Sequence, residues 1–186
     1  MNRASRYVIL HEDKLHLVFV RYFLKKFGVS NHAIDSVRYT KGKGSGEQHV
    51  RNKYSNELVA YRRRASKATT VLIVVIDADA GTVEGHRREL DNAAHANGVN
   101  PRMPQENVVH IIPKWHIETW LAYLAGENVD ENRDYKRQYG YSGRESDCHA
   151  LIDRLFEACK HYQTLTNIPP SLEDACQEFL RIRPLL

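Results

Sequence analysis

Acidic side chains follow several apolar runs of this sequence. Glu12 comes after the first run, Asp77 and Asp79 follow the run 71–76 directly, and Glu118 lies shortly after a later run. Two carboxylates separated by one residue repel each other unless a positive charge lies between them. Oxygen ligands of high total charge suit Mg²⁺ or Mn²⁺ better than zinc. The residue types therefore predict a divalent-metal site, with Mg²⁺ or Mn²⁺ as its cofactor.

These residues suggest a division of roles in the hydrolysis of a phosphodiester. Asp77, Asp79 and Glu118 would hold the metal, and Glu12 would accept a proton or act as a further ligand. Lys114 would supply positive charge to the reacting phosphate. Two of these residues have an equally simple structural interpretation, because Glu118 suits the first turn of a helix and Lys114 suits an ordinary solvated surface.

A glycine-rich, basic segment lies between the first two groups of acids. Closely spaced glycines let backbone N–H groups approach a phosphate, and the start of the following helix adds a positive dipole. The segment does not have the Walker A spacing, and a flexible loop followed by a solvated helix face is the structural alternative. We expect nucleic-acid phosphates to bind here, at Lys41, Lys43, Gly44, Ser45, Gly46, Arg51, Arg62, Arg63 and Arg64.

The periodicity of apolar residues indicates how these groups are brought together. It predicts strands at 6–10, 37–39, 71–76 and 108–112, and helices at 15–27, 47–64, 83–96, 117–124, 147–162 and 171–181. Strands that alternate with helices imply right-handed crossovers and a mostly parallel sheet covered by helices on both faces. The carboxyl ends of parallel strands meet at one edge, so we expect the acids and the basic segment to lie there.

The chain of 186 residues is expected to form one domain. Residues 1–126 would form an α/β core with four strands. Residues 127–186 would add a long polar loop and two helices packed on the same domain. Asp13 would cap the first helix, and Ser171 would cap the last, with Asp174 three residues further on.

The net charge of +4 hides a strong asymmetry between two parts of the chain. Residues 1–70 hold 15 Lys/Arg against 5 Asp/Glu, a net +10, and residues 71–186 hold 12 against 18, a net −6. The positive part predicts a polyanionic partner. There is no signal-peptide core, and the run 71–76 is far shorter than the roughly 20 residues of a membrane helix, so we expect a cytoplasmic protein without a membrane span.

Several of these motifs resemble the Toprim domain of topoisomerases, primases, recombination-repair proteins and overcoming-lysogenization-defect nucleases. The similarity covers about residues 6–125 and is carried by RYVILHEDK, by the glycine-containing loop and by VLIVVIDADAG, while the run IETWL is similar to small stand-alone Toprim-like proteins of bacteria. The resemblance implies that Glu12 acts as a general acid or base and that Asp77 and Asp79 coordinate Mg²⁺. The sequence departs from the family where Asp13 replaces the usual glycine after the glutamate.

We therefore expect a Mg²⁺-dependent nuclease acting on DNA or RNA, in phage defence or RNA maturation. One alternative is a non-catalytic module that binds nucleic acid or another macromolecule. Another is a haloacid-dehalogenase-like phosphatase, whose opening motif is also D-x-D, although the second acidic pair of that family is missing here. A partner protein could be required for activity, and the oligomeric state is left open.

Overall fold

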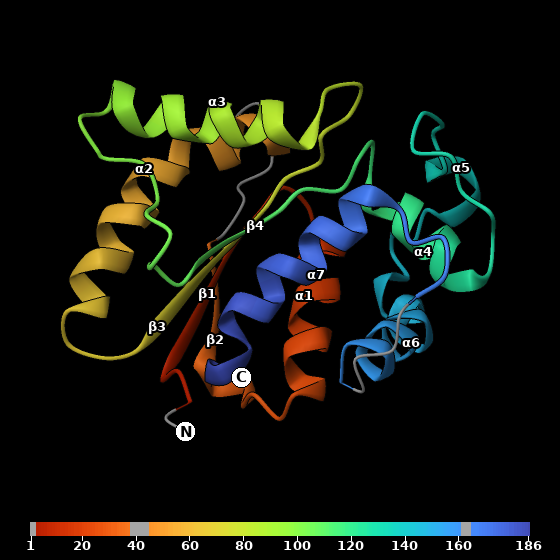
Figure 1. Cartoon of the computed structure of the whole chain (residues 1–186), viewed down its shortest axis with the longest axis horizontal. Coiled ribbons are helices and arrows are strands. Elements are labelled where there is room, and N and C mark those ends of the chain that lie inside the picture. The colour runs from red at the N-terminus through yellow and green to blue at the C-terminus, as the bar shows by residue number, and fades with distance from the viewer. Residues whose placement is uncertain (1–2, 38–44, 161–164) are drawn as a thin grey trace.

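Four parallel strands form the centre of the fold. The structure is a computed structural model that describes residues 3–37, 45–160 and 165–186. The strands lie in the order β2-β1-β3-β4 (Figure 1). Their bounds are β1 Arg6–His11, β2 Ile34–Val37, β3 Thr70–Val75 and β4 Val108–Ile111. The expected α/β class is confirmed, and every pairing between these strands is parallel.

The helices follow the expected alternation. Their bounds are α1 Lys14–Lys26, α2 Gly46–Ala65, α3 Val83–Ala96, α4 Ile117–Ala125, α5 Lys136–Tyr139, α6 His149–Lys160 and α7 Pro170–Ile182. The second strand begins three residues earlier than expected, and the polar region 127–147 contains the short helix α5 and the start of a 3₁₀ helix at Glu145–Cys148. No helix in the described ranges has the length and apolarity needed to cross a bilayer.

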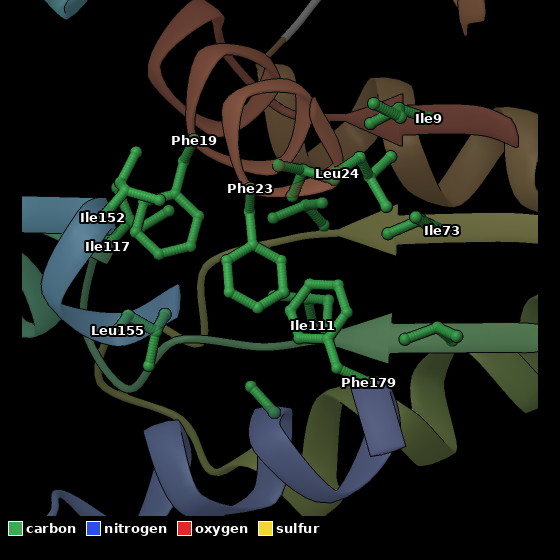
Figure 2. Packing of buried hydrophobic residues seen from close by; sticks show 14 of the residues in the cluster. Ile9, Phe19, Phe23, Leu24, Ile73, Ile111, Ile117, Ile152, Leu155 and Phe179 are labelled. Atoms are coloured by element: carbon green, nitrogen blue, oxygen red, sulfur yellow. The ribbon is translucent and has the colours of Figure 1, made fainter. Parts of the chain in front are cut away.

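Alternate strand residues point to opposite faces of the sheet and build two apolar layers. On one face Ile9, Ile73 and Ile111 pack against α1, α4, α6 and α7. Figure 2 shows this layer, with Phe23 of α1 and Phe179 of α7 close to the strands and a ring-centroid distance of 4.7 Å between them. The helices α6 and α7 thus share a core with the sheet.

The other face is covered by α2 and α3 (Figure 1). Leu10 and Val74 of the strands meet Leu58 of α2 and Leu90 of α3, and all four side chains are completely buried. Both faces of the sheet are covered, which is why β3 is a continuous β-branched and leucine run instead of an alternating one.

The expected cap of the last helix is wrong. The cap position of α7 is Pro169, and the helix begins at Pro170, whose fixed φ suits the first helical position. Ser171 lies inside the first turn, where it is buried. Its hydroxyl forms hydrogen bonds that join α7 to Lys114, to Trp120 of α4 and to Glu131.

Candidate functional site

The strand order places a topological switch point, called the crevice below, at the carboxyl ends of β1 and β3. From β1 the chain crosses to β2 through α1 on one face, whereas from β3 it crosses to β4 through α3 on the other face. Neighbouring strands whose connections leave in opposite directions mark the place where open α/β sheets bind ligands. In the register between the two strands, His11 lies opposite Val75, so the residues that follow both strands come level at this edge.

Glu12 and Asp77 meet in this crevice. The backbone N–H of Asp77 donates a hydrogen bond to Glu12 Oε2 at 3.1 Å, and His16 Nε2 lies 2.9 Å from Asp77 Oδ1. Ligand atoms of the three side chains all lie within 4.8 Å of one another. The structure thus brings together two of the expected acids, and it adds an imidazole.

The start of α1 places His16 in the crevice. Asp13 caps the helix as expected, because its carboxylate accepts a hydrogen bond from the backbone N–H of His16 at 2.9 Å. His16 is therefore in the first turn, and its side chain is fully buried on the face that packs on the sheet. One ring nitrogen, Nδ1, is buried without a hydrogen-bond partner and lies 3.6 Å from Asp13 Oδ1.

Burial and mutual repulsion perturb the carboxyl groups of the crevice. Burial, with the Asp77 charge as the next cause, raises the pKa of Glu12 to about 7. Burial and the same Asp77 charge also raise the pKa of Glu118, which lies in the first turn of α4. Both effects favour the protonated carboxyl form, so the site has an excess of negative charge that a cation would relieve.

His16 has the opposite perturbation. Burial by itself disfavours the charged imidazole, but the adjacent carboxylates of Asp77 and Asp13 outweigh burial and raise the pKa of His16 to about 10. At neutral pH the imidazole is therefore a buried cation. One such charge cannot balance Glu12, Asp77 and Glu118 together.

The start of α2 closes the crevice from the other face of the sheet. Ser45 caps this helix by accepting a hydrogen bond from the backbone N–H of Gln48 at 3.1 Å. A Cβ on Gly46 would lie well inside van der Waals contact with Glu12 Cγ and with the Glu12 carbonyl oxygen. The backbone of α2 can approach Glu12 this closely only because residue 46 is a glycine, and the positive end of the helix lies beside the acid.

Asp79 does not join the Glu12–Asp77 pair. Its backbone forms a two-bond bridge with Trp115, at 3.0 and 3.2 Å, and it has a positive φ of 43°. Its carboxylate lies 3.1 Å from His116 Nε2, further along the sheet edge. The two aspartates thus have different partners, His16 for Asp77 and His116 for Asp79, and the expectation that both face one cation stays a prediction.

The side chain of Lys114 also lies near Asp79, at the edge of the sheet. Its ammonium group donates hydrogen bonds to the carbonyl oxygens of Asp79, at 3.4 Å, and Gly81. The expected role of Lys114 at the reacting phosphate stays a prediction.

The fold places the described residues of the basic segment at different ends of α2. Arg51, in the second turn of α2, pairs with Glu47 and with Glu89, the latter at 2.6 Å. His86 lies beside these acids and completes a second group of metal-ligating types, but the Arg51 guanidinium already supplies its positive charge. Lys41, Lys43 and Gly44 lie outside the described residues.

The three consecutive arginines lie at the other end of α2. A helix of 20 residues is about 30 Å long, so Arg62, Arg63 and Arg64 are far from the crevice, near the amino ends of the strands. Arg62 makes two hydrogen bonds to Glu106, at 2.7 and 3.0 Å. The structure does not bring these arginines to the edge at which the sequence placed them.

His16 is the functional residue that sequence reasoning missed. His16 lies among the apolar residues of α1 and belongs to no recognisable metal-ligand motif in the sequence. The available signal was its position four residues after Glu12 and three after Asp13, which places it in the first turn of a capped helix.

The residues of the crevice fit a divalent cation. Glu12, Asp77 and Glu118 supply oxygen ligands and surplus negative charge, whereas the protonated His16 holds Asp77 and has no lone pair for a metal. Comparisons with protein-family models, curated proteins and solved structures give no match for this chain. We therefore infer a function from the geometry of the crevice.

Proposed function

We propose that this protein is a divalent-metal-dependent nuclease that hydrolyses phosphodiester bonds in DNA or RNA. The observation that carries the proposal is that the half-buried carboxyl group of Glu12 and the buried carboxyl group of Asp77 lie together at the switch point of the sheet, with ligand atoms within 4.8 Å of each other. Their position matches the role that the Toprim resemblance gives them. We assign no ligand role to Asp79, because its carboxylate is paired with His116.

Each described residue of the crevice has a task in this reaction. Asp77 and Glu118 would hold Mg²⁺ or Mn²⁺, which supplies Lewis-acid charge to the phosphate and makes a bound water more acidic. Glu12, with a pKa near 7, accepts the proton of the attacking water at neutral pH. The N–H groups at the start of α2 bind a non-bridging phosphate oxygen.

His16 is a positioning residue in this proposal. It holds Asp77 Oδ1 at 2.9 Å, so the carboxylate has one defined orientation and keeps Oδ2 for a ligand. Its positive charge also reduces the repulsion between Asp77 and Glu12 when no substrate is bound.

The test is cleavage of labelled single- and double-stranded DNA and RNA by the purified chain, with Mn²⁺ or Mg²⁺ and with a chelator as the blank. We expect Asp77→Asn and Glu12→Gln each to reduce the cleavage rate by at least roughly 100-fold. Asp35→Asn is the matched control, because Asp35 lies on the edge strand β2 and pairs with the exposed Arg6.

Other outcomes would contradict the proposal. Undiminished cleavage by folded Asp77→Asn would remove the crevice as the active site. Salt-sensitive retention of nucleic acid in a gel without any cleavage would favour the non-catalytic binding module. Release of phosphate from a small monoester, without cleavage of polynucleotides, would favour a phosphatase. Calorimetry measures Mn²⁺ binding to the wild-type protein and to Asp77→Asn. We expect weaker binding to a variant that still folds, which distinguishes loss of the metal from loss of the fold.

A further inference from the structure

A cleft of about 1000 Å³ lies beside the crevice at the same edge of the sheet. Its walls are the start of α3, the segment 128–132, Lys114 and the segment 167–174 at the start of α7. This volume suits a ligand of nucleotide size. No residue assigned to the proposed metal centre lines it, so it is a separate place for a ligand.

A carboxylate is held rigidly in this cleft. The hydroxyl of Ser171 donates to Glu131 Oε1 at 2.5 Å, and the backbone N–H of Ser171 donates to the same oxygen at 3.0 Å. Ser171 is 2% exposed and receives hydrogen bonds from the buried indole of Trp120 at 2.8 Å and from the backbone of Lys114 at 3.1 Å. This network orients Glu131 from three separate parts of the chain.

The second oxygen of Glu131 remains available to a ligand. Across the ranges that the structure describes, Oε2 of Glu131 makes no hydrogen bond, while Oε1 accepts both from Ser171. A carboxylate accepts hydrogen bonds and donates none when ionised. The cleft therefore presents a pre-oriented acceptor for a ligand that carries N–H or O–H donors.

The charges of the lining argue against a phosphate in the cleft. Arg87 is paired with Asp174 at 2.6 Å, and the ammonium of Lys114 is bound to backbone carbonyls. The acids Glu84, Asp130, Glu131 and Asp174 outnumber these two cations. Side-chain amides and apolar residues complete the lining: Asn128, Asn132, Asn167, Val83, Ile168 and Pro170.

We infer that the cleft binds an unpaired guanine base of the nucleic-acid substrate, with Glu131 as the residue that determines specificity. Guanine carries two adjacent donors, N1–H and the N2 amino group. Glu131 Oε2, which accepts no hydrogen bond among the described residues, has two lone pairs that can accept from both donors, while Oε1 stays bound to Ser171. The asparagine amides can bind the remaining polar atoms of the base, and the apolar residues can contact its faces. This inference rests on the proposed function, since Lys114 links the cleft to the edge at which the phosphodiester would be cleaved.

The binding test uses the whole chain in the presence of a chelator, so that the metal centre takes no part. Guanosine, inosine, adenosine and inorganic phosphate are titrated separately by calorimetry. We expect saturable binding of guanosine and at least roughly tenfold weaker binding of inosine, which lacks the N2 amino group, and of adenosine. Equal binding of the three nucleosides, binding of phosphate, or no binding of guanosine would each overturn the inference.

Two variants locate the site. Glu131→Gln should weaken guanosine binding at least roughly tenfold, because the amide presents one acceptor and one donor group to the base. Glu173→Gln is the matched control. Glu173 is exposed in the first turn of α7, close in sequence to Ser171, and does not line the cleft. If Glu131→Gln does not fold, NMR of the wild-type protein replaces it. Guanosine should then shift the side-chain amide signals of Asn128 and Asn132, and shifts confined to other regions would overturn the inference.

A cleavage experiment separates this inference from the proposed function. Single-stranded oligonucleotides with one guanine should be cut beside that guanine, and Glu131→Gln should lose the preference while it keeps cleavage. Cleavage without base preference, together with no guanosine binding, removes the guanine site and leaves the nuclease. Guanosine binding without cleavage of any oligonucleotide removes the nuclease and leaves the site.

Discussion

The positive charge of His16 reduces the electrostatic repulsion between the carboxylates of the crevice. Glu12 and Asp77 are close neighbours, and the charge of Asp77 adds to burial in raising the pKa of Glu12. The imidazole lies against Asp77 and compensates part of this repulsion. A buried charge that loses its partner destabilises a protein by several kcal/mol, so His16 and Asp77 depend on each other for folding.

At this scale the structure predicts an unusual ionisation of His16. Its pKa is raised to about 10, so in NMR spectra its two ring nitrogens should both carry protons at pH 8. A folded-state pKa above the unfolded value of about 6.5 gives stability that is complete below pH 6.5 and is lost as the pH rises through about 10.

The matched variants for this prediction are His16→Gln and His32→Gln. His16→Gln should lower the free energy of unfolding at pH 7 by roughly 3 kcal/mol, measured with urea, because the buried Asp77 loses its cationic partner. His32 lies exposed in the 3₁₀ helix Asn31–Ala33, and its replacement should change stability little. A neutral His16 ring at pH 8 would contradict the assignment.

At the scale of the elements, the two ends of α2 have different tasks. The amino end lies against Glu12 in the crevice, whereas the carboxyl end is anchored by Arg62 to Glu106 and to the carbonyl oxygens of Asn100 and Pro101. The helix thus connects the candidate site with the segment that precedes β4.

Because α2 approaches Glu12 so closely, we expect alanine at residue 46 to destabilise the protein, although alanine normally stabilises a helix relative to glycine. Helix propensity favours alanine over glycine by about 1 kcal/mol, but a Cβ at residue 46 would collide with the backbone of Glu12. We expect Gly46→Ala to lower the free energy of unfolding by roughly 1–3 kcal/mol in urea denaturation. Ser45→Ala, which removes only the cap, should cost about 1 kcal/mol. Stabilisation by Gly46→Ala would show that α2 does not touch Glu12.

At the carboxyl end of α2, we expect replacement of two neighbouring arginines to have different effects on the free energy of unfolding. Arg62→Ala leaves the carboxylate of Glu106, 9% exposed, without its bidentate partner and should lower the free energy of unfolding by about 2 kcal/mol. Arg63 is exposed, so Arg63→Ala should leave stability nearly unchanged. Equal thermal unfolding curves for both variants would contradict a structural role of Arg62.

At the scale of the whole molecule, the fold brings the two oppositely charged parts of the chain together. Cations of residues 1–70 pair with acids of residues 71–186, and these contacts consume part of the +10 of the first part. The pairs are Lys14–Glu145, Lys26–Asp153, Arg51–Glu89 and Arg62–Glu106. The charge asymmetry of the sequence therefore reflects attraction within the molecule as well as the expected polyanionic partner.

Buried histidines predict a loss of stability at acid pH. Burial, with the nearby Arg102 as the next cause, lowers the pKa of His110 well below its usual value, and burial lowers the pKa of His11 to about 4. A depressed folded-state pKa means that the unfolded chain binds the proton more tightly, so stability is present above about pH 6.5 and is lost as the pH falls.

The change in stability between pH 7 and pH 5 tests the contribution of His110. Its buried ring lies 3.0 Å from the hydroxyl of Tyr54. For His110→Gln, the loss of unfolding free energy on going from pH 7 to pH 5 should be smaller than in the wild type by roughly 1–2 kcal/mol. The same loss in both proteins would mean that His110 already carries a proton at neutral pH.

The fold class and the acids next to the strands could be read from local sequence. Apolar runs of β-branched residues separated by amphipathic segments predict a parallel α/β sheet, because each pattern reflects the burial of one element. Glu12 and Asp77 could be placed at one edge because residues that follow parallel strands share it. Asp13 could be recognised as a helix cap because that contact lies within a single turn.

Only the tertiary structure decided which of these residues meet. It turned Asp79 toward His116, placed Arg62 about 24 Å along α2 from Gly46, inserted His16 between Asp13 and Asp77, and joined Ser171 to Glu131. These outcomes depend on the direction of side chains and on contacts between residues up to 61 positions apart, as for His16 and Asp77. Local sequence determines the elements because their hydrogen bonds and burial are local, whereas the site depends on how the packed elements align, which no single segment encodes.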